Sequence, residues 1–166
     1  MPNYCEGDLV VWGEDPSLVD FIEQARNGEV ALSADKFIPY PDRYRALDEA
    51  AKEWEAANPN GSLRDRPKDG FNAGGYEWRL ANWGCKWDFG NVRVLKLDPS
   101  YRVAYTFSTA WSPAKPVLAK MTFLYPKLRF SYYWYEQGMQ QQGSYEASGG
   151  RITREYTGYY DGPRGG

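Results

Sequence analysis

Residues 128–136 place the strongest constraint on the fold, because apolar and polar or amphipathic side chains alternate along the whole stretch. Successive side chains of a β-strand point to opposite faces of a sheet, so a period of two predicts a strand that buries one face. The predicted buried face holds Leu128, Phe130, Tyr132 and Trp134. The predicted opposite face holds Arg129, Ser131, Tyr133 and Tyr135. The chain is therefore expected to build its core on a β-sheet.

The elements before this strand predict an α+β fold of the ferredoxin-like type. Short β-branched and aromatic runs predict strands at 8–13, 92–97 and 102–108. One helix is expected to follow Asp15-Pro16, where an N-cap residue precedes a proline at the first helical position. Another is expected to open at Ser112-Pro113. The resulting order β-α-β-β-α-β is the split βαβ arrangement, which has an antiparallel sheet.

A long insertion, residues 29–91, separates the first predicted helix from the second predicted strand. An apolar stripe at helical spacing predicts a helix over 43–58 with Asp42 as its cap. The segment 60–75 is rich in glycine, proline, asparagine and charge, which predicts a surface loop. The insertion is therefore expected to be helical with one irregular segment.

The C-terminal part predicts a β-hairpin, because two short strand-like runs flank Ser148-Gly149-Gly150. Residues 161–166 predict a flexible tail. We find no repeat, so residues 1–160 are predicted to form a single domain, and a chain of this length can bury a core.

The chain contains no histidine and two cysteines, and this excludes several classes of function. Histidine is the side chain most used for acid–base catalysis near neutral pH and the commonest metal ligand. Triads that need histidine and four-ligand Cys/His zinc sites are excluded, and we expect no enzymatic activity, metal or cofactor. A formal net charge of −2 gives no general attraction to nucleic acid or anionic membranes. Without a membrane-spanning run, a signal-peptide pattern or a cysteine-rich scaffold, a cytoplasmic protein is expected.

Three clusters of residues are more distinctive than the rest of the chain. They are Met1-Pro2-Asn3-Tyr4-Cys5, the segment 82–88 (NWGCKWD) and the segment 107–113 (FSTAWSP). Together they resemble the phage- and plasmid-borne YubB-like or Api-type proteins, a family with a ferredoxin-like domain. The resemblance spans residues 1–138, with Ala114 where the family has a second proline. It implies a ferredoxin-like fold and a mobile-element origin, and it supplies no catalytic residue.

The tryptophans of these clusters suggest a candidate pocket. On a helix, Trp83 and Trp87 would share a face, and Trp111 lies at a strand-to-helix turn beside a helix N-terminus, which favours anions. One hypothesis is that a planar group stacks on these tryptophans while its phosphate or carboxylate meets Lys86 and the turn. The alternative is that the tryptophans pack the insertion onto the sheet. The residues of the candidate pocket are Trp83, Lys86, Trp87, Asp88, Thr109, Trp111 and Ser112.

A tyrosine-rich surface is the second candidate site. Tyr133 and Tyr135 lie on the predicted strand face opposite the core, and Arg129 and Arg154 are close enough in sequence to meet phosphates there. Outward aromatics on such a sheet can stack nucleic-acid bases, but the RNP1 pattern of RRM domains is absent. Tyrosine and tryptophan are also enriched in protein interfaces. A protein interface is the preferred interpretation, with packing and nucleic-acid binding as the alternatives.

Together these observations and the resemblance predict a non-enzymatic accessory protein of a phage or mobile element that binds and blocks a host factor. Inhibition of a bacterial defence system, such as an anti-CRISPR role, is the most concrete form of this prediction. The alternative is a module that binds a small molecule or nucleotide, or single-stranded nucleic acid through its sheet aromatics. The expected partner is a host protein in the bacterial cytoplasm, and no membrane partner is expected.

Overall fold

A six-stranded antiparallel sheet is the centre of the computed structural model, which describes residues 3–14 and 16–162. The strand order across the sheet is β2-β3-β1-β4-β5-β6. The strands are β1 (Tyr4–Trp12), β2 (Gly90–Asp98), β3 (Arg102–Ala110), β4 (Arg129–Glu136), β5 (Gln141–Ser148) and β6 (Arg151–Tyr159). The first four strands have the ferredoxin-like order, and the β5–β6 hairpin extends the sheet beyond β4.

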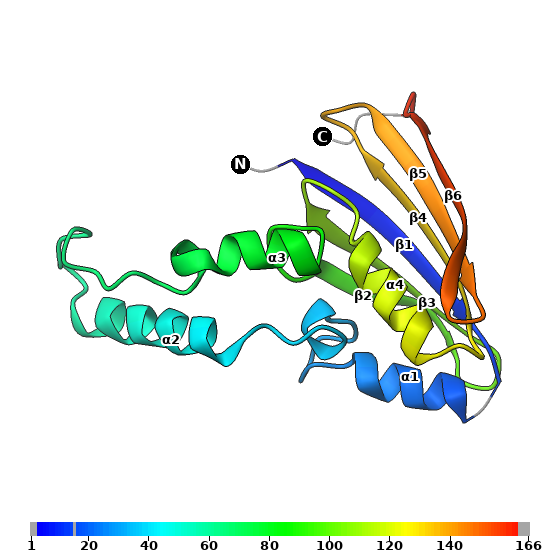
Figure 1. The fold of residues 1–166 in the computed structure, drawn as a ribbon, viewed down its shortest axis with the longest axis horizontal. Coiled ribbons are helices and arrows are strands. Elements are labelled where there is room, and N and C mark those ends of the chain that lie inside the picture. The colour runs from blue at the N-terminus through cyan, green and yellow to red at the C-terminus, as the bar shows by residue number, and fades with distance from the viewer. Residues whose placement is uncertain (1–2, 15, 163–166) are drawn as a thin grey trace.

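Two helices occupy the connections that a ferredoxin-like arrangement requires. Helix α1 (Ser17–Ala25) follows β1, and α4 (Lys115–Leu124) links β3 to β4. Both lie on the same face of the sheet (Figure 1). The predicted fold class, ferredoxin-like α+β with a helical insertion and a C-terminal hairpin, is confirmed. Within the described residues, no helix has the length and apolar character that a membrane crossing requires.

The insertion extends to one side of the sheet and contains α2 (Asp42–Ala57) and α3 (Tyr76–Asn82) (Figure 1). Short helical turns at Ala34–Lys36 and Phe71–Gly75 precede these two helices. The predicted cap of α2 is wrong, because Pro41 holds the N-cap position and Asp42 is the first helical residue. Proline lacks an N–H and has a fixed φ, so it suits the start of a helix.

Only part of the predicted loop 60–75 is a loop, because the turn Phe71–Gly75 runs directly into α3. Gly70 allows this close packing: a Cβ atom there would collide with the backbone of Tyr44 in α2. The glycines that indicate a loop in the sequence thus permit two helical segments to approach each other.

The hydrophobic core takes its strand side chains from one face of the sheet, which we call the inner face. These side chains are Cys5, Leu9, Val11, Val103, Tyr105, Phe107, Phe130, Tyr132, Trp134, Tyr145 and Ala147. Helix α1 packs here through Phe21, whose ring meets that of Phe130 edge-to-face with centroids 5.6 Å apart. The alternation predicted for 128–136 is confirmed. We call the opposite side the outer face, and none of its described strand residues belongs to this core.

Two predicted features lie outside the described residues. They are Asp15, the predicted cap of α1, and residues 163–166 of the predicted tail. Pro16, predicted as the first helical residue, holds the N-cap position instead, and α1 begins at Ser17.

Candidate functional site

Trp83 holds separate segments of the insertion together. Its side chain is 3% exposed, and its indole N–H donates a hydrogen bond of 2.8 Å to the carbonyl oxygen of Ile38. The ring meets Trp78 edge-to-face and lies 5.8 Å from the ring of Tyr40, both measured between centroids. Such a ring has no surface to offer a ligand.

The helical face predicted for Trp83 and Trp87 does not form. Helix α3 ends at Asn82, and Gly84 follows with a φ of 78°. This left-handed conformation suits glycine and commonly ends a helix. Trp83 is therefore buried, whereas Trp87 is half-buried beside Lys86.

Asp88 joins the start of the insertion to the segment before β2. One carboxylate oxygen accepts hydrogen bonds from the backbone N–H groups of Ala34 and Phe89, both at 2.7 Å. The other oxygen accepts a hydrogen bond of 2.6 Å from the hydroxyl of Ser33. These three bonds occupy the carboxylate with the chain's own donors.

The turn between β3 and α4 also uses its polar groups internally. Thr109 is fully buried, and its hydroxyl donates to the carbonyl oxygen of Ser112 at 2.8 Å. The Ser112 hydroxyl donates to the carbonyl oxygen of Gly84 at 2.6 Å. The helix predicted from Ser112-Pro113 begins later, at Lys115, because Ala114 has a non-helical ψ of 55°. The expected anion site at this turn therefore lacks the free hydroxyls that we assigned to it.

Lys86, Trp87 and Trp111 are the predicted pocket residues that the structure brings together around one group. The Lys86 Nζ atom lies 4.6 Å from the ring centroid of Trp87 and 4.9 Å from that of Trp111. It lies 5.7 Å from the ring of Phe71, in the insertion. All three distances are within the range of cation–π attraction.

A cavity of about 230 Å³ opens beside this cluster, and we call it the Trp111 pocket. Its lining residues are Phe71, Asn72, Tyr76, Glu77, Lys86 and Trp111. Sequence reasoning missed the first four, which belong to the insertion. Their spacing carries no signal, because their contact with Trp111 depends on how the insertion returns to the sheet.

Trp111 has an unusual backbone for a large residue. Its φ is 78°, and a bulky side chain in this region costs about 1–3 kcal/mol. Its backbone N–H donates to the carbonyl oxygen of Asn3 at 2.9 Å, which helps to hold the turn. The ring meets Tyr76 edge-to-face and is 41% exposed. Glycine would adopt this backbone without strain, so the backbone alone does not explain a tryptophan here.

The predicted tyrosine surface lies on the outer face. Tyr133 and Tyr135 project there from β4, and the guanidinium of Arg129 on the same strand lies 4.8 Å from the ring centroid of Trp12. Arg154 joins them from β6, where it pairs in register with Glu146. The four predicted residues Arg129, Tyr133, Tyr135 and Arg154 thus share one face of the sheet.

Two carboxylates at the centre of the outer face were missed by sequence reasoning. Glu6 and Asp8 lie on β1, directly opposite Tyr135 and Tyr133 on β4. The sequence predicts this strand only from residue 8, whereas it begins at Tyr4. The sequence gives only a weak signal for these two carboxylates, because Gly7 stands between them where an apolar side chain would mark the buried face of the strand.

The centre of the outer face is acidic and partly dehydrated. Burial raises the pKa of Glu6, and the neighbouring Asp8 carboxylate raises it further, while Arg93 opposes the shift. Burial also raises the pKa of Tyr133 and of Tyr135. A partner that brings a positive charge to this face would relieve the repulsion between the two carboxylates.

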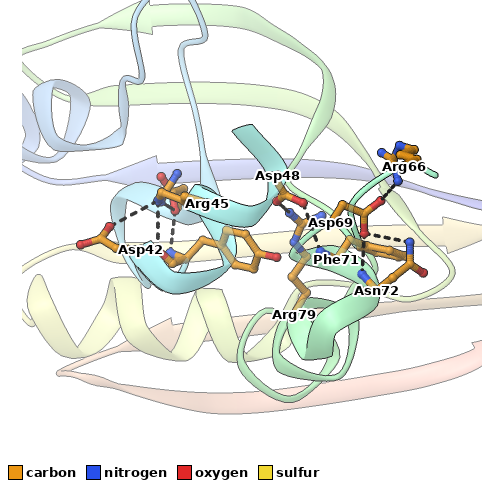
Figure 2. Close-up of polar contacts among 10 residues, drawn as sticks. Asp42, Arg45, Asp48, Arg66, Asp69, Phe71, Asn72 and Arg79 are labelled. Carbon is orange, nitrogen blue, oxygen red and sulfur yellow. Dashed lines mark hydrogen bonds and ion pairs between the residues drawn. The ribbon is translucent and has the colours of Figure 1, made fainter. Parts of the chain in front are cut away.

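A charged groove of about 400 Å³ runs between α2, the following loop and α3. Figure 2 shows how its side chains pair with one another. Asp48 accepts a hydrogen bond from the backbone N–H of Phe71 at 3.1 Å and forms an ion pair with Arg79 at 3.7 Å. Arg66 pairs with Asp69 at 2.7 Å. The Asp48 contacts hold the Phe71 turn and α3 to α2, while the Arg66–Asp69 pair lies within the loop, so the groove has a structural role.

Comparison with known proteins agrees with the fold just described. Residues 83–162 match the family model of the ferredoxin-like domain in Api92-like protein. The matched region contains β2 to β6 and α4. The crystal structure of protein api92 from Yersinia pseudotuberculosis is similar to the chain with a TM-score of 0.55 and 9% identity. That alignment covers 99% of this chain and 100% of api92. At this identity the likeness concerns the fold alone, and no curated protein matches the chain.

Proposed function

We propose that this chain is a non-enzymatic binding module whose outer face binds a protein partner through a basic side chain of that partner. The main support is the position of Glu6 and Asp8 on the central strand β1, each directly beside a tyrosine. A carboxylate next to an aromatic ring matches an arginine, because the guanidinium pairs with the carboxylate and stacks on the ring.

Exposed tyrosines on the outer face support the same proposal. The register places Tyr133, Ser144 and Tyr156 in one row across β4, β5 and β6. Tyr133 is 39% exposed and Tyr156 is 55% exposed. Tyrosine and tryptophan are the residues that protein interfaces favour, since a large rigid ring buries area at low entropic cost. The row therefore offers two anchors around the acidic centre.

Nucleic acid is the weaker candidate for the same face. A strand lying across β1 would bring its phosphates close to Glu6 and Asp8, which repel them. The sheet aromatics flank this centre, and Arg93 and Lys96 lie on the edge strand β2. The acidic pair at the centre thus favours a basic group there over a phosphate, while the basic side chains of this face lie on the strands around it.

In biological terms, we propose that the partner is a host factor in the bacterial cytoplasm and that binding blocks it stoichiometrically. The motif resemblance to phage- and plasmid-borne proteins supports this setting, and a bacterial defence complex is its most concrete target. A chain without histidine, with an exposed aromatic and acidic face, is suited to occupying a partner's surface rather than to chemistry.

The test is affinity capture from a bacterial lysate with the wild-type chain and four variants. Asp8→Lys and Tyr133→Ala change the outer face, while Asp65→Lys and Phe123→Ala change exposed residues away from it, in the insertion and on α4. A stoichiometric partner should be captured by the wild-type chain and by both controls, and lost with both outer-face variants. A partner that survives Asp8→Lys would refute the proposed face.

A binding assay with labelled single-stranded DNA and RNA separates the two classes of partner. We expect the wild-type chain not to bind at moderate salt. Asp8→Lys replaces a negative by a positive charge, so any residual nucleic-acid binding should be stronger in this variant than in the wild type. Tight binding by the wild-type chain that falls steeply with salt would overturn the assignment to a protein partner.

A further inference from the structure

We propose that the Trp111 pocket binds a small planar molecule that carries one carboxylate group. The pocket shares no lining residue with the central outer-face residues Glu6, Asp8, Tyr133 and Tyr135, so this inference is independent of the proposed protein partner.

The first argument is the charge of Lys86. Within the part of the chain that the structure describes, Lys86 forms no ion pair, and its ammonium group lies against the faces of three aromatic rings. A half-buried cation that only rings compensate attracts an anion more strongly than a solvated lysine does. The backbone N–H of Lys86 lies 3.5 Å from the carbonyl oxygen of Ala110, which ties this segment to the end of β3.

The second argument is the shape of the walls. Three of the lining residues, Phe71, Tyr76 and Trp111, are aromatic, and rings pair best with other flat groups. The ring of Trp111 is held by its edge-to-face contact with Tyr76 and by the Lys86 ammonium that lies over it. A wall that is already fixed loses little entropy when a ligand binds.

Size and rim charge limit the ligand further. A volume of about 230 Å³ lies below the about 300–1,000 Å³ of common ligand pockets, so it suits one ring or a fused pair rather than a nucleotide. Glu77 lines the pocket and would repel a group with several negative charges. The side-chain NH2 group of Asn72 donates one hydrogen bond to Asp69 at 2.8 Å, which leaves its second N–H for a ligand. A monocarboxylate meets these limits better than a phosphate.

The first experiment is calorimetric titration of the wild-type chain with a matched set of probes. Benzoate and indole-3-acetate should bind. Cyclohexanecarboxylate keeps the charge without the flat ring, and benzamide keeps the ring without the charge, so both should bind at least about ten-fold more weakly. Absence of binding by both aromatic acids at millimolar concentration would overturn the proposal. Tighter binding of benzyltrimethylammonium would overturn it as well, because the rings would then form a cation site.

The second experiment removes the charge alone. Lys86→Met keeps the aliphatic stem and should weaken benzoate binding about ten-fold or more. Lys120→Met is the matched control, since Lys120 also lies over a ring, that of Phe123, at 5.6 Å, and it should leave binding unchanged. Equal affinity of Lys86→Met and wild type would refute the assigned role. Asp8→Lys should bind benzoate normally, which distinguishes failure at this pocket from failure at the outer face.

Discussion

Replacing Asp88 by alanine should strongly destabilise the chain, although the residue stands in one of its most distinctive motifs. The carboxylate satisfies the backbone N–H groups of Ala34 and Phe89 and the hydroxyl of Ser33. All three donor residues are buried. Alanine removes all of these acceptor contacts at once.

The size of the effect follows from those bonds. A buried donor left without a partner costs about 1–3 kcal/mol, so the two backbone N–H groups together cost about 2–6 kcal/mol. The Ser33 hydroxyl can rotate toward another acceptor, so it adds little. We expect a loss of about 4 kcal/mol from a total stability of about 5–15 kcal/mol, which corresponds to a fall in Tm of about 8–16 °C.

Urea unfolding followed by circular dichroism measures this loss directly. The midpoint should fall while the m-value stays constant. Asp65→Ala, at an exposed position in the insertion, is the control and should change stability by no more than about 0.5 kcal/mol. If Asp88→Ala lost less than about 1 kcal/mol, the three hydrogen bonds would not carry the energy assigned to them and the structural role would be refuted.

Three further predictions concern the core and the outer face. Burial raises the pKa of the Cys5 and Cys85 thiols to about 12, so a thiol reagent at about pH 8 should label both only after unfolding; rapid labelling of the native chain contradicts this. Gly143→Ala should lower stability by about 1–3 kcal/mol in urea unfolding, because the new Cβ would collide with the carbonyl oxygen of Tyr156; an unchanged midpoint contradicts it. The pKa of Glu6 is raised in the folded chain, so at a pH just above the ordinary pKa of a glutamate the folded chain already binds a proton there. That proton removes the negative charge that a basic partner needs. The affinity measured by calorimetry should therefore decrease as the pH is lowered through this range. An affinity that does not change with pH argues against Glu6 as a contact.

Hydrophobic periodicity was sufficient for most of the sheet, because side-chain orientation in a strand alternates with the sequence. The first residues of β1 were missed for a physical reason. Gly7 faces the core there, and a Cβ atom would lie 2.7 Å from the ring of Tyr132. The glycine makes room for a large ring on the next strand, yet in the sequence it interrupts the apolar pattern. A contact between two strands that are distant in sequence thus explains why a glycine, which local propensity assigns to a turn, stands inside β1.

Distinctive sequence motifs did not separate packing from binding. The segment 82–88 combines the buried indole of Trp83, the carboxylate of Asp88 that holds the insertion, and the Lys86 ammonium at the pocket. All three residues stand in one short stretch, and their roles differ only through their surroundings. Burial and hydrogen-bond partners distinguish them, and both depend on where the insertion meets the sheet. Tyr76 of the pocket gives no local signal at all.

The β2 edge of the sheet is poorly suited to a partner that binds by adding a strand. Hairpin β5–β6 pairs with β4, so the ferredoxin-like edge strand becomes an interior strand and the outer face gains Tyr156. The edge strand on the opposite side is β2, whose register shifts between Gly90 and Arg93 and again between Val94 and Lys96. Irregular pairing and basic side chains on an edge are devices that hinder the addition of another strand. Recognition at the outer face should therefore depend on side chains, which is why single substitutions at Asp8 and Tyr133 are expected to be sufficient to abolish it.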